Sequence, residues 1–254
     1  MDRMTLDRRS LLAGGAALGL AAGTLPRTAG AGAPMLGLSR PMHYRFTVGD
    51  YEVTTLLDGA VQLDGPYPIF GQNVFEEEVA ELAEEHFLPA GRMEIAFTVT
   101  LVNTGSELVL FDTGNGDIGR RPAAGLLAER LSAAGYAPEM IDKVVITHFH
   151  PDHIGGLTEG GAPAFPNASY VFPAEEYDFW SKADPEGRVG ALTREKVVPL
   201  AERAAMIAPG DAVAPGIEAV KAWGHTPGHT VYHLENGGER LMLMADTANH
   251  YVIS

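Results

Sequence analysis

Apolar residues in this chain gather in short runs separated by turn-forming residues, a pattern that is typical of β-strands. The pair Gly49-Asp50 and the tetrapeptide Asn103-Thr104-Gly105-Ser106 each separate two such runs and favour tight turns. Val144-Val145-Ile146 is apolar throughout, as expected of a strand buried on both faces. The runs predict strands at residues 43–48, 51–57, 97–102, 107–111, 144–146, 217–222, 230–235 and 240–245.

Helical patterns lie between these runs. Asn73 is expected to cap a helix, with Glu76 three residues on completing a capping-box pattern. Pro122 and Gly135 are expected to open and close a second helix, because proline suits a first turn and glycine ends a helix. Two more helices are predicted at residues 174–182 and 191–205. Antiparallel hairpins combined with covering helices indicate an α/β layered (α+β) domain.

Composition narrows the class of protein. The chain has 254 residues, 46% of them hydrophobic and 20% charged, which fits a folded globular protein rather than a disordered one. It has no cysteine, which excludes disulfides, thiolate metal ligands and a cysteine nucleophile. The net charge of −15 repels phosphate backbones, so no nucleic-acid partner is expected.

Residues 1–31 are predicted to be a targeting signal rather than part of the fold. Arg8-Arg9 precedes residues 11–23, a run of Leu, Ala and Gly that is shorter than the roughly 20 residues of a membrane span. Ala29-Gly30-Ala31 supplies a cleavage site with small residues. The segment resembles a twin-arginine (Tat) signal, which implies a periplasmic or secreted protein with no stable membrane association after cleavage. A basic, disordered N-terminus is the alternative; either way, residues 32–254 are left as one domain.

The chemistry is expected in Thr147-His148-Phe149-His150-Pro151-Asp152-His153, which directly follows a buried strand. Two imidazoles two residues apart in a loop can converge on one cation, and a carboxylate and an imidazole just beyond can reach a second. A single histidine is usually a packed core or surface residue. Four ligand-type side chains within six positions favour a metal site instead.

Two later segments carry further ligand-type residues. Gly224-His225-Thr226-Pro227-Gly228-His229 forms a turn with a histidine towards each end, just after a predicted strand. Asp246 comes at the end of the predicted strand 240–245. A carboxylate in that place could bridge two metal ions through its two oxygens.

With these motifs, residues 43–250 resemble the metallo-β-lactamase-fold hydrolases. The resemblance implies an αββα sandwich with a dinuclear site at the edge of its two sheets. It assigns His148, His150 and His229 to one metal and Asp152 and His153 to the other, with Asp246 as the bridge. His225 would shape the turn or support the ligands, and Asp112, in Phe111-Asp112-Thr113-Gly114, would orient site residues without binding metal.

Within that family, the chain looks most like methyl parathion hydrolase and the quorum-quenching lactonases. The similar stretches are residues 101–106, 134–136, 150–153, 164–168 and 225–230. Asp178-Phe179-Trp180 also matches, so Trp180 is expected either to wall an apolar substrate pocket or to pack in the core. β-Lactamases of this fold resemble the chain less, because they usually lack the bridging aspartate.

The resemblance implies a hydrolase with two divalent ions, zinc first among the candidates, that uses a metal-bound hydroxide. Asp152 and Asp246 would be the catalytic residues that orient the hydroxide and pass a proton to the leaving group. The expected substrate is a neutral ester-like small molecule: a lactone, an aryl ester or an organophosphate triester. A homodimer is one expected assembly. A β-lactamase and an inactive, truncated metal-binding relative are the alternatives.

The C-terminus departs from the family pattern. The family continues with further strands and helices and supplies a last histidine to the second metal, whereas this sequence stops at Ser254. His250 is the only later histidine and is expected to be structural. The sequence therefore predicts a fold whose C-terminal part is missing, with an under-coordinated second metal.

Overall fold

The computed structural model describes residues 40–117, 119–120 and 124–253. The signal predicted at residues 1–31 lies outside the described residues. A seven-stranded sheet has the order β1-β2-β3-β4-β5-β8-β9, a four-stranded sheet has the order β10-β11-β12-β13, and β6 and β7 form a small ribbon. The strands of the larger sheet are β1 (His43–Val48), β2 (Tyr51–Leu63), β3 (Met93–Asn103), β4 (Leu108–Phe111), β5 (Lys143–Val145), β8 (Ser169–Pro173) and β9 (Ala204–Ile207). The others are β6 (Thr158–Glu159), β7 (Ala162–Pro163), β10 (Ala212–Ala214), β11 (Ile217–Lys221), β12 (Thr230–Asn236) and β13 (Glu239–Leu243).

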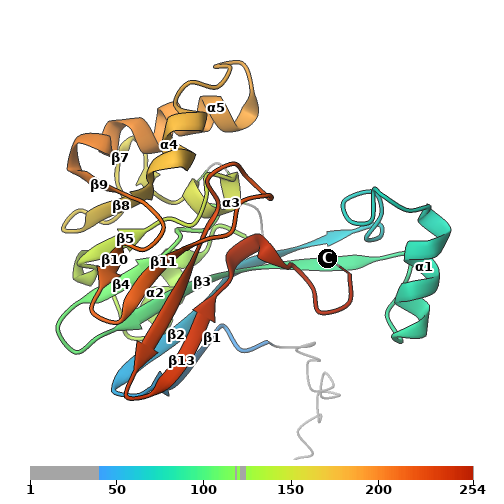
Figure 1. Cartoon of the computed structure of the whole chain (residues 1–254), viewed down its shortest axis with the longest axis horizontal. Helices are drawn as coiled ribbons and strands as arrows, with labels where there is room; N and C mark the ends of the chain where they lie inside the picture. The colour runs from blue at the N-terminus through green and yellow to red at the C-terminus, as the bar shows by residue number, and fades with distance from the viewer. Residues whose placement is uncertain (1–39, 118, 121–123, 254) are drawn as a thin grey trace, which may run out of the picture. The chain divides into compact units, whose positions relative to one another are not determined.

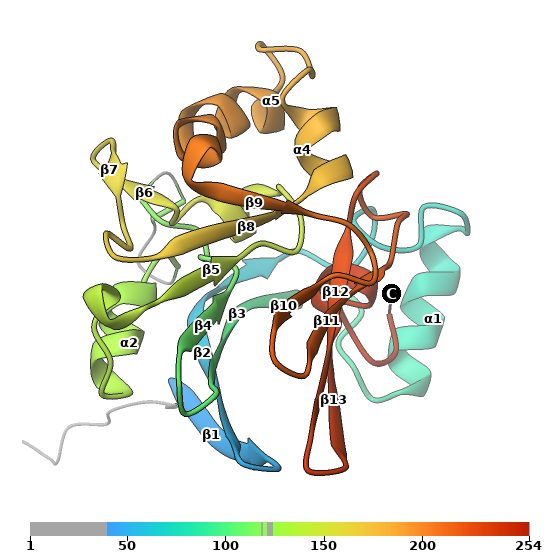
Figure 2. The ribbon, with the colours of Figure 1, turned by 60° about the vertical axis from the view of Figure 1, so that its left-hand side comes forward.

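The helices of the described residues are short. Figure 1 and Figure 2 show α4 and α5 above the β8–β9 end of the larger sheet and α2 beside its β4–β5 region. Their bounds are α1 (Glu76–Glu85), α2 (Leu127–Ala133), α3 (Pro151–Ile154), α4 (Ala174–Trp180) and α5 (Arg188–Leu192). Among the described residues, no helix combines the length and the apolar character that crossing a bilayer requires.

Two hydrophobic cores lie on the two faces of the larger sheet. Successive residues of a strand point to opposite faces, so Val144 packs in the core beneath the helices and Val145 packs between the two sheets. Leu127 and Leu131 of α2 join the helix-side core, and Tyr232 of β12 joins the inter-sheet core. These layers confirm the predicted α/β fold class.

The structure corrects several predicted element boundaries. The first helix begins at Glu76, with Phe75 rather than Asn73 at its N-cap, and the Glu78 carboxylate accepts the Phe75 N–H. The helix predicted at residues 191–205 is divided among the end of α5, a π turn, a 3₁₀ turn and strand β9. Pro199 lies in the 3₁₀ turn, where its missing N–H prevents a continuous α-helix.

Parallel pairing places several strand ends together. β4, β5, β8 and β9 run parallel to one another, so their carboxyl ends lie at one edge of the larger sheet. Asp112 follows β4, the histidine cluster follows β5, and α4 follows β8 directly. Ligand-type residues from distant parts of the chain therefore meet at this edge.

Candidate metal centre

The histidine cluster follows β5 and continues into α3, which begins at Pro151. A proline suits the first position of a helix, so the chain turns from an extended loop into α3 immediately after His150. Asp152 and His153 therefore lie in the first turn of α3, after the proline in sequence, whereas His148 and His150 precede it in the loop.

Four ligand-type residues meet in the first of two groups. His148, His150, His225 and Asp246 each offer one atom, and these atoms lie within 4.8 Å of one another. His150 Nδ1 is 3.1 Å from His148 Nε2 and 2.9 Å from His225 Nε2. Asp246 Oδ2 is 3.3 Å from His225 Nε2.

The second group shares one residue with the first. Asp152, His153 and Asp246 offer atoms within the same limit of 4.8 Å. His153 Nε2 is 3.4 Å from Asp152 Oδ2 and 3.3 Å from Asp246 Oδ1. Asp246 therefore presents a different oxygen to each group. The donor set of imidazoles and carboxylates suits zinc and similar divalent ions, so the residues present fit a dinuclear metal centre.

The two histidines of the 224–229 turn occupy different places. His225, for which the family resemblance implies a supporting role, offers Nε2 to the first group. His229, the predicted ligand, lies beside that group with its ring centre 4.9 Å from that of His148. Its Nδ1 is 3.0 Å from the Ala222 carbonyl oxygen, and its Nε2 accepts the Asp246 N–H. The carbonyl at Nδ1 fixes the ring with Nε2 facing Asp246, in the tautomer that metal-ligating imidazoles adopt.

Asp112 supports the cluster from the end of β4. Its Oδ1 accepts the Thr147 N–H at 2.8 Å, and its Oδ2 lies 2.9 Å from both Thr147 Oγ1 and His153 Nδ1. Asp112 has a left-handed backbone with φ of 64°, which costs a non-glycine residue about 1–3 kcal/mol. Ala245, beside Asp246, has φ of 43°. Strained residues thus lie next to both groups.

Burial keeps three imidazoles neutral. Burial lowers the pKa of His148, and positive charge on His153 lowers it further. Burial and the neighbouring His225 lower the pKa of His150 to about 4 and also lower the pKa of His229. Neutral imidazoles offer a lone pair to a cation, so these residues are in the protonation state that metal binding needs.

Charge pairing dominates around His153. Burial alone would lower its pKa, but the charge of Asp112 and hydrogen bonds with Asp112, Asp152 and Asp246 raise it well above the usual value. Burial alone would raise the pKa of Asp246, but hydrogen bonds from His153 and His225 hold it well below the usual value. A cation held by His153 Nε2 would therefore have to replace a proton.

A cavity of about 530 Å³ opens beside His150 and Asp152. Its wall combines apolar residues such as Phe97 and Leu63 with the polar side chains of Gln62, Asn115 and Arg188, and it is the size of a small-molecule site. Its lining residues are Val61, Gln62, Leu63, Phe97, Asn115, Gly119, Ala124, His150, Pro151, Asp152, Arg188 and Val189.

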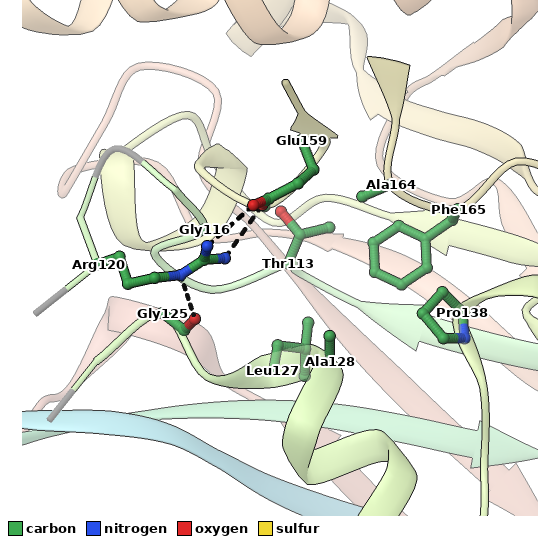
Figure 3. Close-up of a pocket in the computed structure, with 11 residues that line it drawn as sticks. Thr113, Gly116, Arg120, Gly125, Leu127, Ala128, Pro138, Glu159, Ala164 and Phe165 are labelled. Atoms are coloured by element: carbon green, nitrogen blue, oxygen red, sulfur yellow. Dashed lines mark hydrogen bonds and ion pairs between the residues drawn. The ribbon is translucent and has the colours of Figure 1, made fainter. Parts of the chain in front are cut away.

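Trp180 lies close to this cavity without being one of those lining residues. Its ring centre is 6.5 Å from that of His150, it packs against the helix-side core, and its Nε1 donates to Glu176. A separate pocket of about 300 Å³ contains the Arg120–Glu159 ion pair (Figure 3) and none of the ligand-type residues.

Two buried carboxylates at the site were not predicted. Glu176 of α4 and Asp58 of β2 are both fully buried. Glu176 follows Glu175 in a segment that looks like a solvated helix start, and Asp58 comes directly after the strand predicted at residues 51–57. An acid placed among apolar strand residues is a weak sequence signal for Asp58, whereas nothing local distinguishes Glu176.

Gly228 offers a steric test of how the 224–229 turn packs. A Cβ at this position would lie 2.1 Å from the Glu176 nitrogen and 2.6 Å from its Cα, so the backbone of α4 or of the turn would have to move. We expect Gly228→Ala to lower the free energy of unfolding by about 3 kcal/mol, since overpacking against backbone is not relieved by rotamer changes. Gly91→Ala is the control, because a Cβ there meets nothing within 4 Å. Urea unfolding of both variants measures the difference; equal midpoints would contradict this packing.

The family model of the metallo-beta-lactamase superfamily matches residues 98–251, which contain both ligand groups. The chain belongs to the metallo-β-lactamase superfamily. The predicted superfamily is thereby confirmed, and the two packed sheets with their ligand-bearing edge are this superfamily's fold. No curated protein sequence matches the chain.

Several solved structures resemble this superfamily member over most of its length. AidC, a dizinc quorum-quenching lactonase solved with a product, has 26% sequence identity and a TM-score of 0.73 over 79% of this chain and 72% of AidC. The hydrolase AbOPH has 27% identity and a TM-score of 0.71 over 82% of this chain and 74% of its own. A probable metal-dependent hydrolase from Staphylococcus aureus shares the fold, with 22% identity and a TM-score of 0.67 over 79% and 74% of the two chains.

Proposed function

We propose that this protein is a dinuclear metal-dependent hydrolase of neutral ester-like molecules: lactones, aryl esters or organophosphate triesters. The observation that carries the proposal is that two groups of ligand-type atoms share Asp246 and lie beside a cavity of about 530 Å³. The resemblance to AidC supports a lactone among the substrates.

His148, His150, His225 or His229, and Asp246 would hold one divalent ion, and Asp152, His153 and Asp246 the other. Zinc is the first candidate. Bound divalent ions supply Lewis acidity and lower the pKa of water towards about 7. Asp112 holds His153 in place through Nδ1 and leaves Nε2 facing Asp152 and Asp246.

Asp152 and the residues of the cavity wall would act on the substrate. Asp152 lines the cavity and also belongs to the second ligand group, so its carboxylate can accept a proton and return it to a leaving group. The apolar wall around Phe97 and Leu63 excludes water from an ester's alkyl part, and Arg188, Gln62 and Asn115 offer donors to its oxygens.

The proposal also includes the export of the protein and its activity in the periplasm or outside the cell. This part rests on Arg8-Arg9 and the apolar run of residues 11–23.

The decisive experiment compares zinc-loaded wild-type protein with His150→Ala on an acyl γ-lactone, an aryl ester and a phosphotriester. We expect wild-type turnover of at least one substrate and a loss of kcat/KM of about 10²-fold or more in the variant, as when metal binding is impaired. His43→Ala, which changes an exposed histidine of β1, is the control and should match wild type. Equal turnover by His150→Ala, or turnover of a chromogenic cephalosporin alone, would refute the proposal.

A further inference from the structure

We propose that Glu176 is the positioning residue of the metal centre: its buried carboxylate fixes the spacing between the two histidine-bearing loops. This inference rests on the proposed function. Glu176 belongs to neither ligand group, and it lies on α4, an element that carries no ligand-type residue of the centre.

One carboxylate oxygen holds the loop after β5. Glu176 Oε1 accepts the backbone N–H of Phe149 at 2.9 Å, between His148 and His150. The same oxygen accepts the indole N–H of Trp180 at 2.8 Å. Because the Phe149 ring is fully buried in the helix-side core, this backbone bond sets how far the two flanking imidazoles project from the sheet.

The other oxygen holds the 224–229 turn. Glu176 Oε2 accepts the hydroxyl of Thr226 and the backbone N–H of Gly228, each at 2.8 Å. These two residues lie between His225 and His229. A single carboxylate therefore contacts the backbone between each pair of histidines.

Because Glu176 is buried, the loss of any of its hydrogen bonds would cost folding free energy. Glu176 has no exposed surface, and its four donors are all neutral groups. A buried carboxylate needs such a set of donors, and the donors would in turn lose their partner without it. The site thus favours one distance between the loops, at which both sets of bonds form together.

Without Glu176, the loops would be joined mainly at the sheet. The Thr230 N–H donates to the Thr147 carbonyl at 3.0 Å on the strand side of the histidines. Glu176 supplies the ties on the helix side. Its loss is expected to let the turn move relative to the cluster and to change the 2.9 Å separation of His150 Nδ1 and His225 Nε2.

The test is a Co²⁺ titration of metal-free protein, followed by the visible absorption of the bound ion. We expect Glu176→Gln to weaken Co²⁺ binding by about 10- to 100-fold, the usual effect of losing a group that orients ligands, and to alter the absorption spectrum. An amide keeps one acceptor but faces the Gly228 N–H with another donor. Tyr170→Phe is the control: it loses one buried hydrogen bond, to the Phe165 carbonyl, in the same core.

A second, milder variant tests the same role if Glu176→Gln does not fold. Thr226→Val removes only the hydroxyl donor and should weaken Co²⁺ binding less, in the same direction. Wild-type affinity and spectrum in the glutamine variant, or in Thr226→Val if the former does not fold, would overturn the role of Glu176. If the wild-type protein itself bound no Co²⁺, the proposed function would fail first, and the two failures are thus distinguishable.

Discussion

Asp246→Asn is expected to reduce hydrolysis by about 10³-fold and to lower the number of divalent ions bound per chain, because this change disturbs both ligand groups at once. Asp246 Oδ1 lies 3.3 Å from His153 Nε2, and Oδ2 lies 3.3 Å from His225 Nε2. An amide has the same shape, but it offers one oxygen where two are needed, and its NH₂ group cannot bind a cation. The loss of several kcal/mol of charge stabilisation in the transition state accounts for the size of the effect.

The backbone contact of Asp246 should survive this substitution. Its N–H donates to His229 Nε2, and an asparagine retains that N–H. Metal content and kcat/KM, measured on the same preparation, check the prediction. Glu235→Gln is the matched control, since it makes the same chemical change at an exposed carboxylate paired with Arg240. An asparagine variant with two ions and wild-type turnover would rule out a bridging role for Asp246.

Asp58→Ala is expected to give a large loss of stability, about 3–5 kcal/mol, because it removes a fully buried acceptor. Asp58 Oδ1 accepts the Leu127 N–H at 2.9 Å, and Oδ2 accepts the backbone and side-chain N–H groups of Asn115, each at 3.0 Å. Oδ2 also accepts the Gly125 N–H at 3.2 Å. These bonds hold the segment after β4 against β2, so an alanine would leave four donors without their partner, two of them buried.

Urea unfolding of metal-free protein measures this effect independently of the metal centre. Asp64→Ala, which changes an exposed aspartate just after β2, should stay within about 0.5 kcal/mol of wild type. Because Asn115 and Ala124 line the 530 Å³ cavity, Asp58→Ala should also raise KM by a larger factor than it lowers kcat. A midpoint equal to that of Asp64→Ala would show that these hydrogen bonds contribute little.

Local patterns in the sequence were sufficient for much of the fold. The hairpin of β1 and β2 and the buried strand before the histidine cluster were predicted from runs of seven residues or fewer around Gly49 and Val144. Strand β8 was missed because residues 169–173 carry no alternation that separates them from the helix that follows. The helix expected at residues 191–205 was wrong where Pro199 interrupts it and where β9 pairs with β8, a contact that only the tertiary structure provides.

The candidate site was predictable to the extent that its ligands are adjacent in sequence. His148, His150, Asp152 and His153 are brought together by one strand end and one short helix. The approach of His225 depends on how the two sheets pack, so its sequence neighbours do not reveal it. Glu176 contacts the site through bonds that span 27 residues to Phe149 and 52 residues to Gly228, which no local pattern encodes.

The joining of distant segments at one sheet edge has a thermodynamic consequence. His150 and Asp246 are far apart in an unfolded chain, so divalent ions would bind the native protein more tightly than the denatured one. Free ion at a hundred times its dissociation constant then adds at most about 2.7 kcal/mol to the folding equilibrium. The thermal midpoint of this protein would thus follow the ion concentration of its surroundings, and chelation would lower heat resistance and catalysis together.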